Sequence, residues 1–353
     1  MNYIYWIFIA IAICILTIKY YYIFKIRGKD SRVEDPEWVA RMKARADRER
    51  ILQEQKDMEN LRVNEEREAK ALSDELRWSK LDKMSYKEIQ EVRDELDRRT
   101  LKPAISFEAR YTKDLDLCTS KIGGTPYIPK DGQTPIDADG RQLRLIAQIN
   151  LSELPDNTIL PNKGVLQFFA INNNMFGIAP YLNNVNKTNQ VVYYESIDKS
   201  VTNGDVLEKY IPWIEAEDKD FFPVQGEFSL EFELVSESMQ SNDSRFEGLF
   251  CEVWNEKYPD LPIVEIGELP HQDTALDMDY TCFSKIGGYP IYSQYEPIGI
   301  PGNLLFELQS TLRDELIDGR IQIGDGGILH FFVEEEDLSA CEFENAVYHW
   351  DCS

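Results

Sequence analysis

The sequence predicts an α+β fold: an internally duplicated domain with a mainly antiparallel sheet, preceded by a transmembrane helix and a long charged helical stalk. Three observations lead to this prediction. Residues 3–18 carry no charged side chain, residues 37–81 contain neither glycine nor proline, and two nearly identical segments lie about 164 residues apart. We therefore divide the chain into a transmembrane anchor with a basic flank (1–33), a charged stalk (34–100) and a duplicated domain (101–353).

The charge distribution follows the same three parts. The 353-residue chain has a formal net charge of −25. Residues 1–33 hold five basic groups and one acidic group, residues 34–100 are nearly balanced, and residues 101–353 hold 17 basic and 43 acidic groups. A surface this acidic repels phosphate, so we expect no nucleic-acid partner. The hydrophobic content of 43% is enough to fill a sizeable core.

Residues 3–24 are predicted to cross a membrane as one helix. As a helix this segment is about 33 Å long, which matches a hydrocarbon layer of about 30 Å. Aromatic residues stand at both ends, and the basic residues follow the span, so the positive-inside rule predicts a single-pass cell-membrane protein with a cytoplasmic C-terminal domain. A cleaved signal peptide would need a basic segment before the apolar run. The other alternative is a buried helix of a soluble protein, which would not explain why aromatic residues stand at both ends.

A long helix is predicted to begin at Pro36, because proline is favoured in the first turn. It would extend for about 69 Å to residue 81. Its apolar residues keep no strict heptad, so it is either a single-helix spacer or a segment for homo-oligomerisation. Ser85 and Glu88 have the spacing of a capping box, which predicts a second helix that ends before Pro103.

The duplication is the strongest pattern in the chain. Residues 118–126 match residues 282–290 at seven of nine positions, and residues 164–169 resemble residues 327–332 almost in the same register. This predicts two copies of one supersecondary unit about a pseudo-twofold axis. Segments rich in apolar and β-branched residues predict strands over 164–171, 191–195, 228–234 and 328–333.

These segments resemble the YwqG-like family of bacterial proteins over about residues 105–353. The resemblance depends on the motifs at 121–126, 147–151, 164–169, 323–328 and 348–352. It implies a duplicated α+β domain for which no activity is established. The recurrent association of that family with secreted-toxin systems implies an immunity or binding role.

No metal or cofactor is expected. The six cysteines include no Cys-x-x-Cys pair, and His271, His330 and His349 are not at metal-ligand spacing with any of them. We therefore interpret the cysteines as reduced and mostly buried thiols.

The repeated Lys-Ile-Gly-Gly motif gives the first candidate ligand-binding residues. Its glycine amides would receive an anion, and the lysines would add positive charge. The alternative is structural, with glycine forming a tight turn before the next strand. The candidate residues in the two motifs are Lys121, Gly123, Gly124, Lys285, Gly287 and Gly288.

Asp325 and His330 complete the candidate site. Asp325 stands in a glycine-rich run, and His330 follows it by five residues on an apolar strand. The alternative is that Asp325 is only a turn residue, because Asp favours glycine-rich turns. The chain contains no nucleophile motif such as Gly-x-Ser-x-Gly.

Two functions are compatible with these patterns. We expect a membrane-tethered cytoplasmic protein-binding module, with an immunity-type role as one form of it and a basic protein as the partner. The alternative is a hydrolase or small-ligand-binding enzyme that uses a cleft between the repeats. That alternative requires Lys121, Lys285, Asp325 and His330 to converge on one pocket.

Overall fold

The computed structural model describes residues 15–22, 25, 36–177, 186–216, 222–276, 283–294, 296–297, 300, 302–311 and 319–352. The chain forms two compact units, Met1–Ser79 and Lys80–Ser353. Most of the predicted anchor, residues 3–14 and 23–24, lies outside the described residues.

The first unit consists mainly of the long helix α2 (Pro36–Leu81), which begins at Pro36 as predicted. Its 46 residues extend for about 69 Å. Most of its side chains are exposed, and ion pairs one turn apart, such as Arg45 with Glu49 at 2.8 Å, run along its surface. Solvent screens such exposed pairs, so each contributes little to helix stability.

The predicted membrane span and single-pass localisation are wrong. Among the described residues, no helix has both the length and the apolar character needed to cross a bilayer. Helix α2 has the necessary length but is too highly charged along it.

The second unit contains most of the regular structure. Its helices are α3 (Tyr86–Thr100), α4 (Asn203–Leu207), α5 (Phe246–Lys257), α6 (Gln272–Ala275) and α7 (Glu335–Ala340). Its strands are β1 (Lys102–Tyr111), β2 (Lys121–Gly123), β3 (Arg144–Asn150), β4 (Val165–Ala170), β5 (Asn189–Tyr194), β6 (Val224–Gln225), β7 (Glu227–Glu237), β8 (Ser284–Gly287), β9 (Asn303–Gln309), β10 (Arg320–Ile321), β11 (Ile328–Val333) and β12 (Val347–Asp351).

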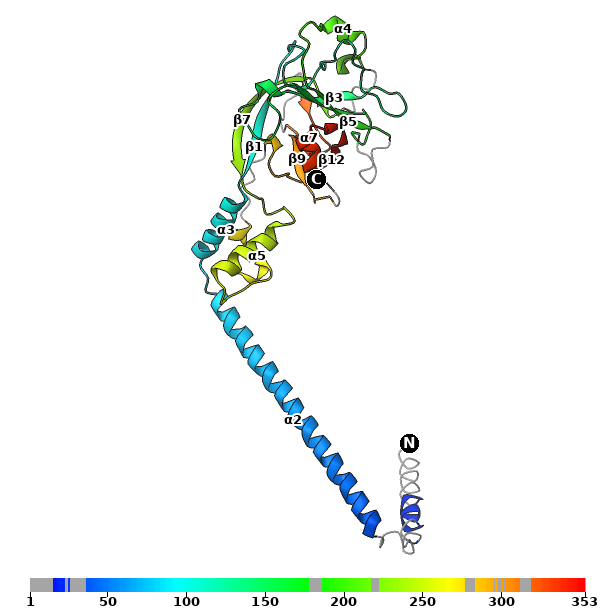
Figure 1. Cartoon of the computed structure of the whole chain (residues 1–353), viewed down its shortest axis with the longest axis vertical. Helices are drawn as coiled ribbons and strands as arrows, with labels where there is room; N and C mark the ends of the chain where they lie inside the picture. The colour runs from blue at the N-terminus through cyan, green and yellow to red at the C-terminus, as the bar shows by residue number, and fades with distance from the viewer. Residues whose placement is uncertain are drawn as a thin grey trace, which may run out of the picture. The chain divides into compact units, whose positions relative to one another are not determined.

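Ten of these strands form one sheet in the order β12-β11-β9-β8-β1-β7-β2-β3-β4-β5. The paired neighbours are antiparallel, and the long strands β1 and β7, which stand in the middle of that order, lie side by side (Figure 1). The predicted fold class, an α+β domain behind a transmembrane helix, is therefore wrong. The two repeats merge into one continuous sheet, and the described residues include no helix able to span a membrane.

The merger results from an exchange of strands between the repeats. The first strand of each repeat, β1 or β7, pairs with the second strand of the other repeat, β8 or β2. Ser106 on β1 faces Lys285 on β8, and Ser229 on β7 faces Lys121 on β2. We call β2–β5 with β7 the first half of the sheet, and β8, β9, β11 and β12 with β1 the second half.

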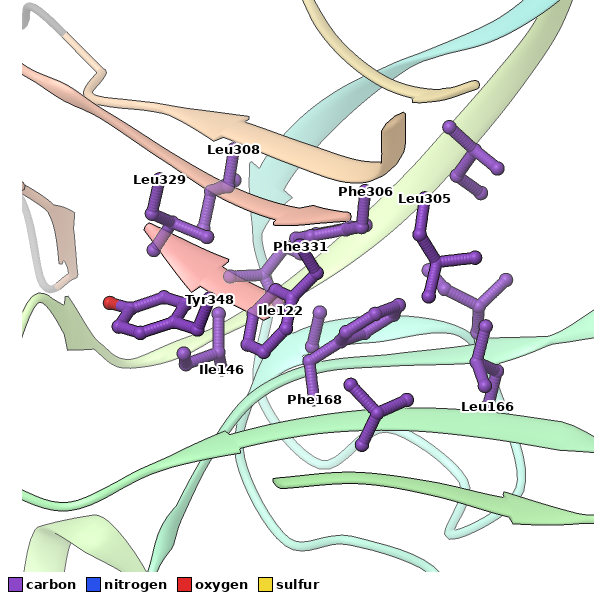
Figure 2. Packing of buried hydrophobic residues seen from close by; sticks show 14 of the residues in the cluster. Ile122, Ile146, Leu166, Phe168, Leu305, Phe306, Leu308, Leu329, Phe331 and Tyr348 are labelled. Atoms are coloured by element: carbon purple, nitrogen blue, oxygen red, sulfur yellow. The ribbon is translucent and has the colours of Figure 1, made fainter. Parts of the chain in front are cut away.

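The inner faces of the two halves share one core. Phe306 of the second half stacks on Phe168 of the first half with ring centroids 4.5 Å apart, and Phe331 lies 4.9 Å from Phe168. Figure 2 shows these rings between the strands with Leu166 and Leu329 nearby. All five side chains are inaccessible to solvent. Each half therefore covers the apolar face of the other.

A second core joins the helices next to the sheet. Ser85 and Glu88 form the predicted capping box at the start of α3, and the prediction is confirmed. α3 then packs Ile89 and Leu96 on α5, which contributes Trp254. α3, the last part of the predicted stalk, thus lies in the second unit.

Candidate functional site

The two candidate lysines are buried and paired with glutamates of the central strand β7. Lys121 Nζ lies 3.2 Å from Glu227 Oε1, and Lys285 Nζ lies 2.9 Å from Glu237 Oε2. Burial lowers the pKa of Lys121, although the negative charge of Glu227 opposes that shift. Strands β7 and β1 lie between the strands that carry the two lysines. The lysines therefore belong to separate places in the sheet.

The candidate glycines enclose the same two glutamates. Gly124 and Gly288 have φ values of +73° and +75°, which favour glycine. A Cβ on Gly124 would overlap the carboxylate of Glu227, and one on Gly288 would overlap the carboxylate of Glu237. The amide of Tyr289 donates a hydrogen bond to Glu237. The other glycine of each loop, Gly123 or Gly287, also has a positive φ value. Each predicted anion loop thus encloses a carboxylate of the chain itself.

Beside each lysine, the halves contain matching polar networks on the outer face of the sheet. In the first half, Gln148 accepts a hydrogen bond from the Tyr127 amide at 2.7 Å, and Gln167 donates to the Tyr127 carbonyl at 2.7 Å. The second half has Glu307 and His330 at these places. Glu307 accepts from the Ile291 amide at 2.9 Å, and His330 Nε2 lies 2.8 Å from the Ile291 carbonyl.

The two networks differ in charge. Lys285, Glu307, His330 and His349 occupy directly paired positions across β8, β9, β11 and β12, so they form one row on one face. Burial alone would raise the pKa of Glu307, but Lys285 and the hydrogen bond from His330 outweigh burial and lower it. The corresponding row of the first half contains Lys121 but is otherwise uncharged.

His330 also lies beside two residues that the sequence patterns did not single out. A ring nitrogen of His330, a ring nitrogen of His349 and a carboxylate oxygen of Asp351 lie within 4.8 Å of one another. Burial and the neighbouring His330 lower the pKa of His349 to about 4. Spacing along the chain did not reveal this cluster, because its members meet across two strands. The available signal was the alternation in His349-x-Asp351, which places both side chains on one face of a strand.

Asp325 lies apart from the buried cluster, exposed in the turn before β11. Glycines of that turn pack on the end of β12. A Cβ on Gly324 would lie 2.7 Å from Cys352 Sγ, and one on Gly327 would overlap the Asp351 carbonyl. The glycine-rich run therefore allows the turn to approach β12 closely.

A separate cleft lies where segments next to the first half of the sheet meet Tyr111 at the end of β1. We call it the Trp213 cleft, and it has a volume of about 790 Å³. Its apolar lining includes Tyr111, Leu207 and Trp213, and its charged lining includes Asp114, Glu215, Glu227, Lys113 and Arg320. Of the candidate residues, Gly124 lines this cleft, but Lys121, Lys285, Asp325 and His330 do not. Those four side chains do not converge on it.

A family model, described as a domain of unknown function (DUF1963), matches residues 120–352. The chain belongs to this family. The match covers about two thirds of the chain and includes every strand of the large sheet except β1. No curated protein matches the chain significantly.

Proposed function

We propose that this member of the DUF1963 family is a YwqG-like protein-binding module that holds a basic segment of a partner protein in the Trp213 cleft. The observation that carries the proposal is the apolar surface of that cleft. Leu207 is 50% exposed and Ile214 is 60% exposed, and both line the cleft. Ile211, which adjoins it in sequence, is 54% exposed. A patch of exposed apolar side chains such as this one is typical of an interaction site.

The net charge of the domain favours a basic partner. At the cleft lining, Lys113 and Arg320 offset Asp114 and Glu215, but residues 101–353 as a whole carry an excess of 26 acidic groups. Apolar anchors would supply affinity, and the acidic surface would accelerate association with a cation-rich protein. An immunity-type role, in which the module occludes a basic toxin, fits this chemistry.

The enzyme alternative has less support. It required Lys121, Lys285, Asp325 and His330 to converge, but the lysines are neutralised by separate glutamates and Asp325 is exposed on a turn. General acid-base catalysis needs such groups within hydrogen-bond reach of a common substrate. We therefore propose binding as the function.

We further propose that α2 serves as a spacer or a self-association segment for this module. Apolar side chains such as Leu52, Leu61 and Leu72 are exposed along the helix. Two copies of α2 would cover them, whereas a single helix would leave them in water. Sedimentation of the full-length chain at several concentrations distinguishes the two roles.

Capture of a partner by the immobilised full-length chain tests the proposed cleft. We expect a basic protein to be retained at low salt and released at high salt, because salt screens the attraction. The Leu207→Asp/Ile214→Asp variant should weaken the binding of that identified protein at least about tenfold, since both anchors are lost. Val264→Asp is the matched control, because Val264 is 87% exposed and does not line the cleft. Equal binding by the cleft variant and the control would refute the proposal.

A further inference from the structure

The cluster of His330, His349 and Asp351 has the composition of a metal site. His330 and His349 face each other across β11 and β12, and Asp351 follows His349 by two residues on the same face. One donor atom of each lies within 4.8 Å of the other two. A metal ion bound at about 2.1 Å from its donors would need these atoms roughly 3–4 Å apart. The side chains would therefore have to draw together by about 1–2 Å on binding an ion.

Each residue of the cluster has one buried polar atom without a hydrogen-bond partner. Within the described part of the chain, His330 Nδ1, His349 Nδ1 and Asp351 Oδ1 have none. The His330 side chain is fully buried, and Asp351 is 8% exposed. Buried polar atoms are normally satisfied, so three such atoms in one cluster point to a place where a ligand can bind.

The hydrogen bond that His330 makes through Nε2 leaves its Nδ1 as the atom able to bind a metal ion. The carbonyl of Ile291 can only accept a hydrogen bond, so His330 Nε2, 2.8 Å away, carries the proton. In the neutral ring this leaves a lone pair on Nδ1. Glu307 Oε2 lies 3.5 Å from the same Nε2. A ligating histidine usually donates its other N–H to a carbonyl or carboxylate in this way.

Asp351 is likewise held in place from one side. Its Oδ2 accepts a hydrogen bond from the Gln294 amide at 2.8 Å, which leaves Oδ1 to bind a ligand. The ring of Tyr292 covers the cluster, with its centroid 5.1 Å from that of His330 and 6.2 Å from that of His349.

The first half lacks all three donors. Its sheet positions corresponding to His330, His349 and Asp351 hold Gln167, Val192 and Tyr194. The same strand geometry is therefore maintained without these donors, and framework stability does not by itself require them.

We propose that His330, His349 and Asp351 bind a divalent first-row transition-metal ion such as Zn²⁺. Two imidazoles and one carboxylate suit these ions better than Mg²⁺ or Ca²⁺, which prefer oxygen donors. Three protein ligands leave at least one coordination position open, as in catalytic rather than structural zinc sites.

Titration of the untagged full-length chain with Co²⁺ tests the proposal, because Co²⁺ replaces Zn²⁺ and gives visible absorption bands. We expect one equivalent to bind, and excess Zn²⁺ to displace it. The His330→Gln/His349→Val variant copies the residues of the first half and should lose at least about 100-fold in affinity. Glu307→Gln, which removes only a supporting carboxylate, should lose about 10–100-fold.

His271→Asn is the control, because His271 lies outside the cluster and asparagine tolerates its positive φ of 53°. Circular dichroism of each variant in EDTA establishes that it is folded. Thermal unfolding gives a second measurement, since Zn²⁺ should raise the Tm of the wild type and of His271→Asn but not that of the double variant. No Co²⁺ absorption in the wild type, or equal affinity in the double variant and the wild type, would overturn the proposal.

Discussion

The two halves of the sheet have the same strand pattern but different chemistry on the outer face. The first half places Gln148 and Gln167 beside its buried lysine, and the second half places Glu307 and His330 there. Hydrogen bonds to the covering segment are equivalent in both. The backbone frame is thus common to both halves, whereas the buried glutamate, the two histidines and the aspartate of this face are specific to the second half.

The largest expected effect is on the free energy of unfolding when the glutamate of either lysine–glutamate pair is replaced. Glu227→Gln leaves Lys121 without its paired carboxylate and should reduce the free energy of unfolding by about 3–5 kcal/mol. Glu237→Gln should cost about 1–3 kcal/mol, because Glu307 still interacts with Lys285. Urea unfolding of both variants measures the difference. Equal losses would show that Glu307 does not compensate.

Substitutions in the glycine loops should also reduce the free energy of unfolding more in the first half than in the second, but by a smaller difference. A Cβ on Gly123 would overlap the backbone carbonyl of Gly226, whereas one on Gly287 would lie 3.0 Å from the flexible side chain of Ile159. Gly123→Ala should therefore cost about 3 kcal/mol and Gly287→Ala about 1–2 kcal/mol, of which the positive φ accounts for about 1–2 in each. Chemical denaturation again provides the measurement, and a larger loss for Gly287→Ala would contradict the packing argument.

The smallest effect concerns Tyr194, which takes the place of Asp351 in the first half. Burial raises the pKa of Tyr194 to about 12 from its ordinary value near 10. Because the folded-state pKa is raised, the associated stability is present below pH 10 and is lost as the pH rises through 12. The Tm of the wild type should thus fall more steeply than that of Tyr194→Phe between pH 10 and 12. Parallel curves for the two proteins would show that Tyr194 does not contribute to this pH dependence.

Local patterns in the sequence predicted individual elements well. The helix beginning at Pro36 and the capping box of Ser85 and Glu88 depend on residues close together in the chain, and both are present. Predicted strands such as 164–171 and 328–333 correspond to β4 and β11 within a residue or two. The repeated motif also identified two equivalent places in the sheet.

Long-range pairing was not accessible from one sequence. The glutamates that neutralise Lys121 and Lys285 come from β7, which lies about 50–100 residues away in the chain. The exchange of β1 and β7 between repeats depends on pairing energies that no local pattern encodes. For the same reason, His349 and Asp351 were not connected with His330 until the register of β11 and β12 was known.

The exchange of strands also has a consequence for synthesis of the chain on the ribosome. β1 pairs with β7 and β8, and Lys285 leaves the ribosome about 180 residues after its partner Ser106. At roughly 5–20 residues per second, β1 waits about 10–35 s for that neighbour. During this interval its backbone amides and carbonyls are exposed as a template for pairing with other nascent chains. The exchange of strands therefore delays folding of the sheet until late in translation. Chaperones that shield residues 102–111 should increase the yield of native protein.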